Sequence, residues 1–198
     1  ITALAVGLGL LIGLVASLAQ LSKSPLLRLP AKIYVDCIRG TPLLIQIFII
    51  YFALPNIIGH RIDPFVAAVT ACSLNSGAYI AEIFRGGIQS ISQGQFRAGL
   101  SLGMTYGQTM RYIVLPQAVK RIIPPLGNEF IALIKETSVV SFVGATDLYV
   151  AFNYIGTNSY EFMVPYLVMA IIYILMILVI SLGIKLMERG LKRSDRRS

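Results

Sequence analysis

The run from Val164 to Met187 limits most strongly what this chain can fold into, because it contains a single charged residue, Lys185. A helix of about 20 apolar residues is long enough to cross the hydrocarbon core of a bilayer. The composition agrees, since 56% of the 198 residues are hydrophobic and 13% are charged, whereas an average soluble domain has roughly 25% charged residues. The sequence therefore predicts a membrane protein and argues against a soluble enzyme, a coiled coil or a disordered chain.

Four further apolar runs precede this one, so we expect an all-α membrane protein with five transmembrane helices in a single domain, 1–198. The polar stretch after the first run is expected to be a loop, and the segment 94–118 is too polar and too rich in glycine to span. We expect that segment to be amphipathic and to lie between the third and fourth spans. The expected spans are residues 1–21, 42–58, 65–84, 122–143 and 164–187.

The basic residues predict how the spans are oriented. If the loop after the first span is cytoplasmic, fifteen of the seventeen Lys and Arg residues fall on the cytoplasmic side, and only Arg61 and Lys135 do not. Cytoplasmic loops carry such an excess of positive charge, so the N-terminus is expected outside and the C-terminus in the cytoplasm. The basic tail, which includes Lys192, Arg193, Arg196 and Arg197, is expected to contact anionic membrane lipid rather than nucleic acid.

Three glycines in the segment 94–118 recur every four residues: Gly99, Gly103 and Gly107. In a continuous helix they would share one face. Because each glycine costs a helix about 1 kcal/mol relative to alanine, a stripe of three indicates close packing at that face. Two interpretations remain open from spacing alone: the helix lies against the protein's own spans, or it is a docking surface for a cytoplasmic partner.

The same segment resembles the EAA loop of permease subunits of ATP-binding cassette (ABC) importers. That pattern is Glu-Ala-Ala, three residues, Gly, nine residues and Ile-x-Leu-Pro; Ala98, Gly103 and residues 113–116 fall on it. Two positions depart from the pattern, because Arg97 stands where the family has Glu and Gly99 where it has the second Ala. Further segments narrow the resemblance to permeases for polar amino acids such as histidine, glutamine and arginine: 39–43 with Gln46, 78–87, 128–130 and 135–138.

The resemblance implies a bacterial inner-membrane permease that couples through residues 95–108 to a partner ATPase. It also implies two ATPase subunits, a second permease copy, identical or different, and an extracytoplasmic amino-acid-binding protein. ATP and Mg²⁺ are expected on the ATPase, and this chain has no phosphate-binding loop, because no Gly is followed by Lys. The ATPase-coupling residues implied here are Gln95, Arg97, Ala98, Gly99, Gly103 and Gly107.

Polar residues within two spans predict a substrate site. Ionisable groups inside a span are costly, so they are functional candidates by default. In the fourth span Asn128, Glu129 and Ala132 lie on one stripe, and in the third span Asn75, Tyr79 and Glu82 lie on another. Glu129 has no Lys or Arg at i+3 or i+4 and is the first candidate for a substrate's ammonium or guanidinium group. Glu82 has a structural alternative, because Arg85 stands at i+3.

These residues favour a transporter of polar, basic amino acids that works by alternating access. The competing class is a channel or secondary transporter that works without ATP, and the amphipathic glycine-rich segment argues against it. An intramembrane enzyme is a third class, but no Gly-x-Ser-x-Gly or His-Glu-x-x-His pattern is present. No catalytic residue is expected, and a multi-histidine metal site is excluded because His60 is the only histidine.

Overall fold

The computed structural model describes the backbone of residues 1–195 and side chains up to residue 190. Within that range the chain forms helices joined by short turns, without a β-strand. The elements are α1 (Thr2–Leu21), α2 (Pro25–Arg39), α3 (Leu43–Phe48), η1 (Ile49–Ala53), α4 (Leu54–Ile58), α5 (Pro64–Gln89), α6 (Gln93–Ser101), α7 (Tyr106–Thr109), η2 (Met110–Val114), α8 (Leu115–Glu136), η3 (Thr137–Val143), α9 (Leu148–Ser159) and α10 (Met163–Asp195).

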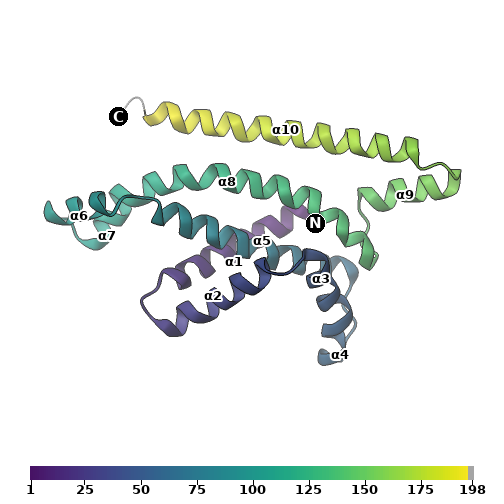
Figure 1. Cartoon of the computed structure of the whole chain (residues 1–198), viewed down its shortest axis with the longest axis horizontal. Coiled ribbons are helices and arrows are strands. Elements are labelled where there is room, and N and C mark those ends of the chain that lie inside the picture. Colours follow the sequence, from purple (N-terminus) through teal and green to yellow (C-terminus); the bar gives the residue numbers. More distant parts are fainter. Residues whose placement is uncertain (196–198) are drawn as a thin grey trace.

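Helix α5 is the centre of the fold and packs against α1, α2 and α8 (Figure 1). Its buried face is built from small side chains, including Ala67, Ala71 and Ala78. Small residues let helices approach closely, which is how helices associate where lipid is as apolar as the side chains. Helix α10 lies along the outer side of α8 (Figure 1). No residue in the most apolar 18-residue stretch of α10 is buried in the single chain. That surface is left for lipid or for another subunit.

The second span differs from the expectation, because the polar stretch after α1 is the helix α2 and not a loop. Pro25 occupies the first helical position, where a proline is tolerated. The helix is amphipathic: Val35 is buried and Tyr34 donates a 2.6 Å hydrogen bond to the carbonyl of Leu74, while Arg28 and Lys32 are exposed. The axes of α2 and the segment 43–58 make an angle of 109°, so the two form one bent pair.

The fourth span also begins earlier than expected. Helix α8 starts at Leu115 rather than near residue 122, so Pro124 and Pro125 do not open it. Both prolines lie inside it, as membrane helices tolerate when neighbouring groups satisfy the freed carbonyls. Between the fourth and fifth expected spans the chain forms helix α9, which the Asp147 side chain caps by accepting a 2.9 Å hydrogen bond from Val150 N.

Three helices are each long and apolar enough to cross a membrane: α1, α5 and residues 163–190 of α10. The two bent pairs, 25–39 with 43–58 and 106–143 with 148–159, bring the number of candidate spans in the described chain to as many as five. An all-α membrane fold is therefore confirmed, and five is its upper count. The basic tail residues Arg196 and Arg197 and the side chains of Lys192 and Arg193 lie outside the described residues.

Candidate functional site

The bend between α2 and α3 is held by the buried side chain of Gln46. Its amide nitrogen donates to the carbonyls of Ile38 (2.8 Å) and Thr41 (3.0 Å) and to the Thr41 hydroxyl (3.0 Å). Its amide oxygen accepts a 3.1 Å hydrogen bond from Nδ2 of Asn75 on α5. Asn75, which the sequence proposes as a substrate residue, is thus 3% exposed and engaged in fixing the bend.

Replacing Gln46 by leucine is expected to destabilise the protein by about 2 kcal/mol, because it removes the hydrogen bonds that join the end of α2 to α3 and leaves the buried Asn75 amide without its Gln46 partner. The expected result is a lower midpoint of thermal unfolding in detergent. Asn56→Ala is the matched control, since the exposed Asn56 amide makes one local hydrogen bond to Phe52. Asn75→Leu should then cost less in the Gln46→Leu background than in the wild type, and strict additivity of the two changes would contradict the network.

Glu82 is the centre of an ion-pair cluster near the end of α5. Nε and Nη2 of Arg85 donate to its two carboxylate oxygens at 2.9 and 2.6 Å, and Arg39 Nη1 lies 3.6 Å from Oε2. The Arg39 guanidinium also lies 5.3 Å from the centre of the Tyr79 ring. The structure therefore joins Glu82 and Tyr79 to the end of α2 through Arg39. Of the two interpretations of Glu82, the i, i+3 pair with Arg85 is present.

Glu129 lies in a different environment, beside a small apolar cavity of about 260 Å³ between α1, α5, α8 and α10. It is the one charged residue among those that line this cavity. Within the described side chains no ion pair forms with its carboxylate. The side chain of Ser76 lies next to it, and the buried Ser76 hydroxyl has no hydrogen-bond partner among the described residues. A lone carboxylate between helices can accept an ammonium or guanidinium group.

The two predicted polar stripes do not meet in the cavity beside Glu129. The cavity beside Glu129 includes Ile80 of α5 but not Asn75, Tyr79 or Glu82. On α8, Asn128 is exposed and Ala132 is partly buried. Ser76 is a neighbour of Glu129 that the sequence does not single out, because one serine among small helix residues carries no distinctive pattern. Gln46 could be found from sequence, since it is an amide within an apolar run.

The predicted coupling segment is two helices rather than one. Helix α6 ends at Ser101 and α7 begins at Tyr106, with Gly103 between them at φ +82°. Met104 N donates to Gly99 O at 3.2 Å and Gly103 N to Leu100 O at 3.0 Å, which is the Schellman pattern that terminates a helix. Thr105 and Gln108 then exchange side-chain and backbone hydrogen bonds and start α7. The expectation of one helix with a three-glycine stripe is wrong, because the chain turns at Gly103.

Only Gly99 of the three glycines is packed closely. A Cβ at Gly99 would lie 2.9 Å from Thr109 Cγ2 and 3.0 Å from Ile113 Cδ1, whereas nothing lies within 4 Å of such an atom at Gly103 or Gly107. Glycine in place of the family's alanine at this position therefore lets α6 approach Thr109. Thr109 and Ile113 belong to the same segment, so this close contact is neither packing against a span nor docking of a partner.

Three other predicted coupling residues are exposed to solvent on this helix pair. Gln95, Arg97 and Ala98 are all exposed on α6. The Gln95 side chain accepts a 2.8 Å hydrogen bond from Gln117 Nε2, which links α6 to the start of α8. Because this hydrogen bond holds α6 against the start of α8, the exposed surface of α6 is suited to contact with another protein. In the described part of the chain, no three His, Cys, Asp or Glu side chains form a group that could hold a metal ion.

Comparisons with known proteins agree with this architecture. Residues 6–193 match the family of binding-protein-dependent transport system inner membrane components. The chain is 40% identical to the arginine transport system permease protein ArtQ of Bacillus subtilis over 188 residues, which cover 95% of this chain and 86% of that protein. It is also 40% identical to the glutamine transport system permease protein GlnP of Escherichia coli K12, covering 93% of this chain and 84% of that one.

Solved structures show the same fold. An amino acid ABC transporter crystallised with histidines has a chain that superposes with a TM-score of 0.91 at 44% identity, covering 96% of this chain and 88% of that one. The MetNI methionine ABC transporter in an inward-facing conformation gives a TM-score of 0.78 at 20% identity, which supports the fold alone.

The helices, the bent spans and the exposed turn between α6 and α7 define a multi-pass transport subunit of the inner membrane. The chain belongs to the binding-protein-dependent transport system inner membrane component family. It is a permease subunit of an ABC importer, not an enzyme, and such importers carry their ATPase on a separate subunit and work with a binding protein. The alternative of an ATP-independent channel or secondary transporter is not favoured.

Proposed function

We propose that this permease imports polar amino acids with a preference for basic ones. The observation that carries the proposal is the Glu129 carboxylate, which lines an otherwise uncharged cavity of about 260 Å³ and lacks a basic partner among the described side chains. A site of that size suits a small ligand. Two relatives are named for arginine and for glutamine transport, which supports the amino-acid class. Asn128 and Ala132 lie on the same face of α8 and complete the proposed contact, whereas Asn75, Tyr79 and Glu82 of α5 lie outside the lining of this cavity.

The assay for this function is uptake by the intact importer, with the permease, its ATPase and its binding protein reconstituted in proteoliposomes. Arginine, lysine, histidine, glutamine and a neutral apolar amino acid are compared at equal concentration. We expect ATP-dependent uptake of arginine and lysine to exceed that of the others. Uptake that does not depend on ATP, or faster uptake of the apolar amino acid, would contradict the proposal.

The proposed topology has the N-terminus outside and the C-terminus in the cytoplasm. The turn between α1 and α2, the helices α6 and α7 and the far end of α10 all lie toward one end of the molecule (Figure 1). These segments carry basic residues such as Lys23, Arg97 and Arg189, which favour the cytoplasmic side. A second permease, identical or different, and two ATPases complete the proposed assembly, with ATP and Mg²⁺ bound on the ATPases. The uncovered apolar surface of α10 supports a further subunit or lipid there.

Coupling is proposed to pass through the turn at Gly103. A β-branched residue there is strained, because left-handed backbone costs a residue other than glycine about 1–2 kcal/mol and Gly103 has φ +82°. Gly103→Val is expected to separate ATP hydrolysis from uptake, so that uptake per ATP falls while the subunit still inserts. Gly103→Asn is the control, because asparagine tolerates this conformation and should retain coupling. Normal uptake per ATP in Gly103→Val would refute the role of this turn.

A further inference from the structure

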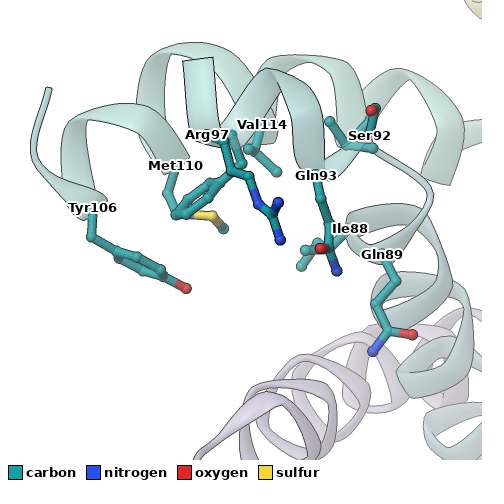
Figure 2. Close-up of a pocket in the computed structure, with 10 residues that line it drawn as sticks. Ile88, Gln89, Ser92, Gln93, Arg97, Tyr106, Met110 and Val114 are labelled. Carbon is teal, nitrogen blue, oxygen red and sulfur yellow. The ribbon is translucent and has the colours of Figure 1, made fainter. Parts of the chain in front are cut away.

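A pocket of about 650 Å³ lies between the end of α5, α6, α7 and η2 (Figure 2). Its floor is apolar and includes Phe96, Met110 and Val114. Its edge is polar, and Arg97 is the one charged residue that lines it. The pocket therefore combines a surface that excludes water with a single positive charge. The full lining is Ile88, Gln89, Ile91, Ser92, Gln93, Phe96, Arg97, Tyr106, Met110 and Val114.

The guanidinium of Arg97 has no partner among the described residues. Figure 2 shows its side chain directed into the pocket, between Tyr106 and Met110 on one side and Gln93 on the other. Neither ion pair of the described chain involves Arg97, and no described side-chain hydrogen bond uses its guanidinium. The nearby Gln89 oxygen already accepts a 2.7 Å hydrogen bond from Arg85 Nη1. Five N–H donors are thus available at an edge where apolar walls strengthen an ionic contact.

An occupant of this pocket must carry negative charge. A carboxylate matches the planar fork of a guanidinium and can accept two parallel hydrogen bonds from it. A small free anion would meet only one cation here and would leave the apolar floor uncovered. An acidic side chain on a protein surface would cover the floor and pair the charge together. The exposure of α6 on both sides of the pocket leaves room for such a surface.

We propose that this pocket receives an aspartate or glutamate side chain of the partner ATPase, and that Arg97 restricts this permease to ATPases that carry an acid at that position. The inference rests on the proposed coupling through α6 and α7. It adds which partner carries which charge. Arg97 occupies the position at which the related pattern has Glu, so the charge on the permease side is positive instead of negative. An ATPase with a basic residue there would be repelled by Arg97.

The first test compares binding of the ATPase to the purified permease for Arg97→Glu and for Arg28→Glu. Arg28 is also an exposed arginine, but it lies on α2, outside this pocket. Reversing one partner of an interfacial charge pair should raise the dissociation constant by about 30-fold or more, and raising the salt concentration should weaken the wild-type complex more than the Arg97→Glu complex. Arg28→Glu should bind as the wild type does. Equal affinity of wild type and Arg97→Glu would overturn the proposal.

The second test identifies the opposing group directly. In the assembled complex of Arg97→Lys, a carbodiimide should activate a carboxylate of the ATPase, and the amine of the introduced lysine should displace the activating group to form an amide. Mass spectrometry then locates the link, with Arg28→Lys as the control. A link from position 97 to an Asp or Glu of the ATPase is the expected result. A link only within the permease, or to a second permease, would overturn the inference while leaving the importer function intact. If the wild-type permease binds no ATPase, the proposed function itself fails.

Discussion

Replacing Gly13 by leucine is expected to prevent the native packing of α1 on α5. A Cβ at Gly13 would lie 2.6 Å from Ile80 Cγ2 and 2.9 Å from the carbonyl oxygen of Gly77. The second of these atoms belongs to the backbone, so repacking of side chains cannot relieve the clash. Inserting larger groups into a packed core typically costs about 1–3 kcal/mol, occasionally more. Leucine carries three further carbons toward Ile80, and we expect a cost at or above the upper end of this range.

The measurement is the folded fraction of purified subunit after size-exclusion chromatography in detergent, followed by thermal unfolding. Gly7→Leu is the matched control on the same helix, because nothing lies within 4 Å of a Cβ at Gly7. The unfolding temperature of Gly13→Ala should lie between those of Gly13→Leu and Gly7→Leu. If Gly13→Leu and Gly7→Leu unfold at the same temperature, the close contact between α1 and α5 is not the one described here.

Glu129→Gln is expected to lower uptake of arginine and lysine at least tenfold and to change uptake of glutamine by no more than about twofold. Glutamine keeps the shape of the side chain but removes its negative charge. A hydrogen bond to a charged group contributes about 1.5–3 kcal/mol, which corresponds to a tenfold or greater change in kcat/KM for a cationic substrate. A substrate with a neutral side chain makes no such charged contact, so its uptake should change little.

The measurement is initial uptake by the reconstituted importer over a range of concentrations of each amino acid. Glu188→Gln is the control, since Glu188 is a carboxylate of α10 that does not line the cavity beside Glu129. The ratio of arginine to glutamine uptake should fall for Glu129→Gln alone. Equal losses for both amino acids would assign Glu129 to stability or gating rather than to the recognition of charge.

Much of the fold follows from local pattern. The apolar lengths of α1, α5 and α10 predict membrane helices, because a span has to satisfy its backbone internally and keep about 20 apolar residues in the bilayer. The small residues Gly9 and Gly13 predict helix packing, and both meet α5 at residues 76–80. By contrast, α2 does not look like part of a span, since its charged residues suggest a loop. Its helical form depends on burying Val35 and on the Tyr34 contact with α5.

The contacts of the candidate site are likewise of two kinds: some follow from local spacing, and others depend on the tertiary structure. Glu82 with Arg85 is a local i, i+3 pair that spacing alone predicts, and the structure contains it. The third partner, Arg39, comes from a different helix and depends on the bend after α2. The single coupling helix is wrong for a local reason that periodicity does not register: Gly103 adopts a left-handed conformation. A regular four-residue spacing of glycines cannot distinguish a packed stripe from a helix end.

The sequence by itself determined that this is a multi-pass membrane protein and which few polar and charged groups within it need a function, because the cost of burying such a group in lipid acts on each residue wherever it stands. Only the tertiary structure decided which of those groups are already paired. Gln46 engages Asn75, and Arg39 joins Arg85 on Glu82. Glu129 and Arg97 keep no ionic partner in the described chain. The reason is geometric: pairing depends on the angle at which helices cross and bend, and long-range packing sets that angle.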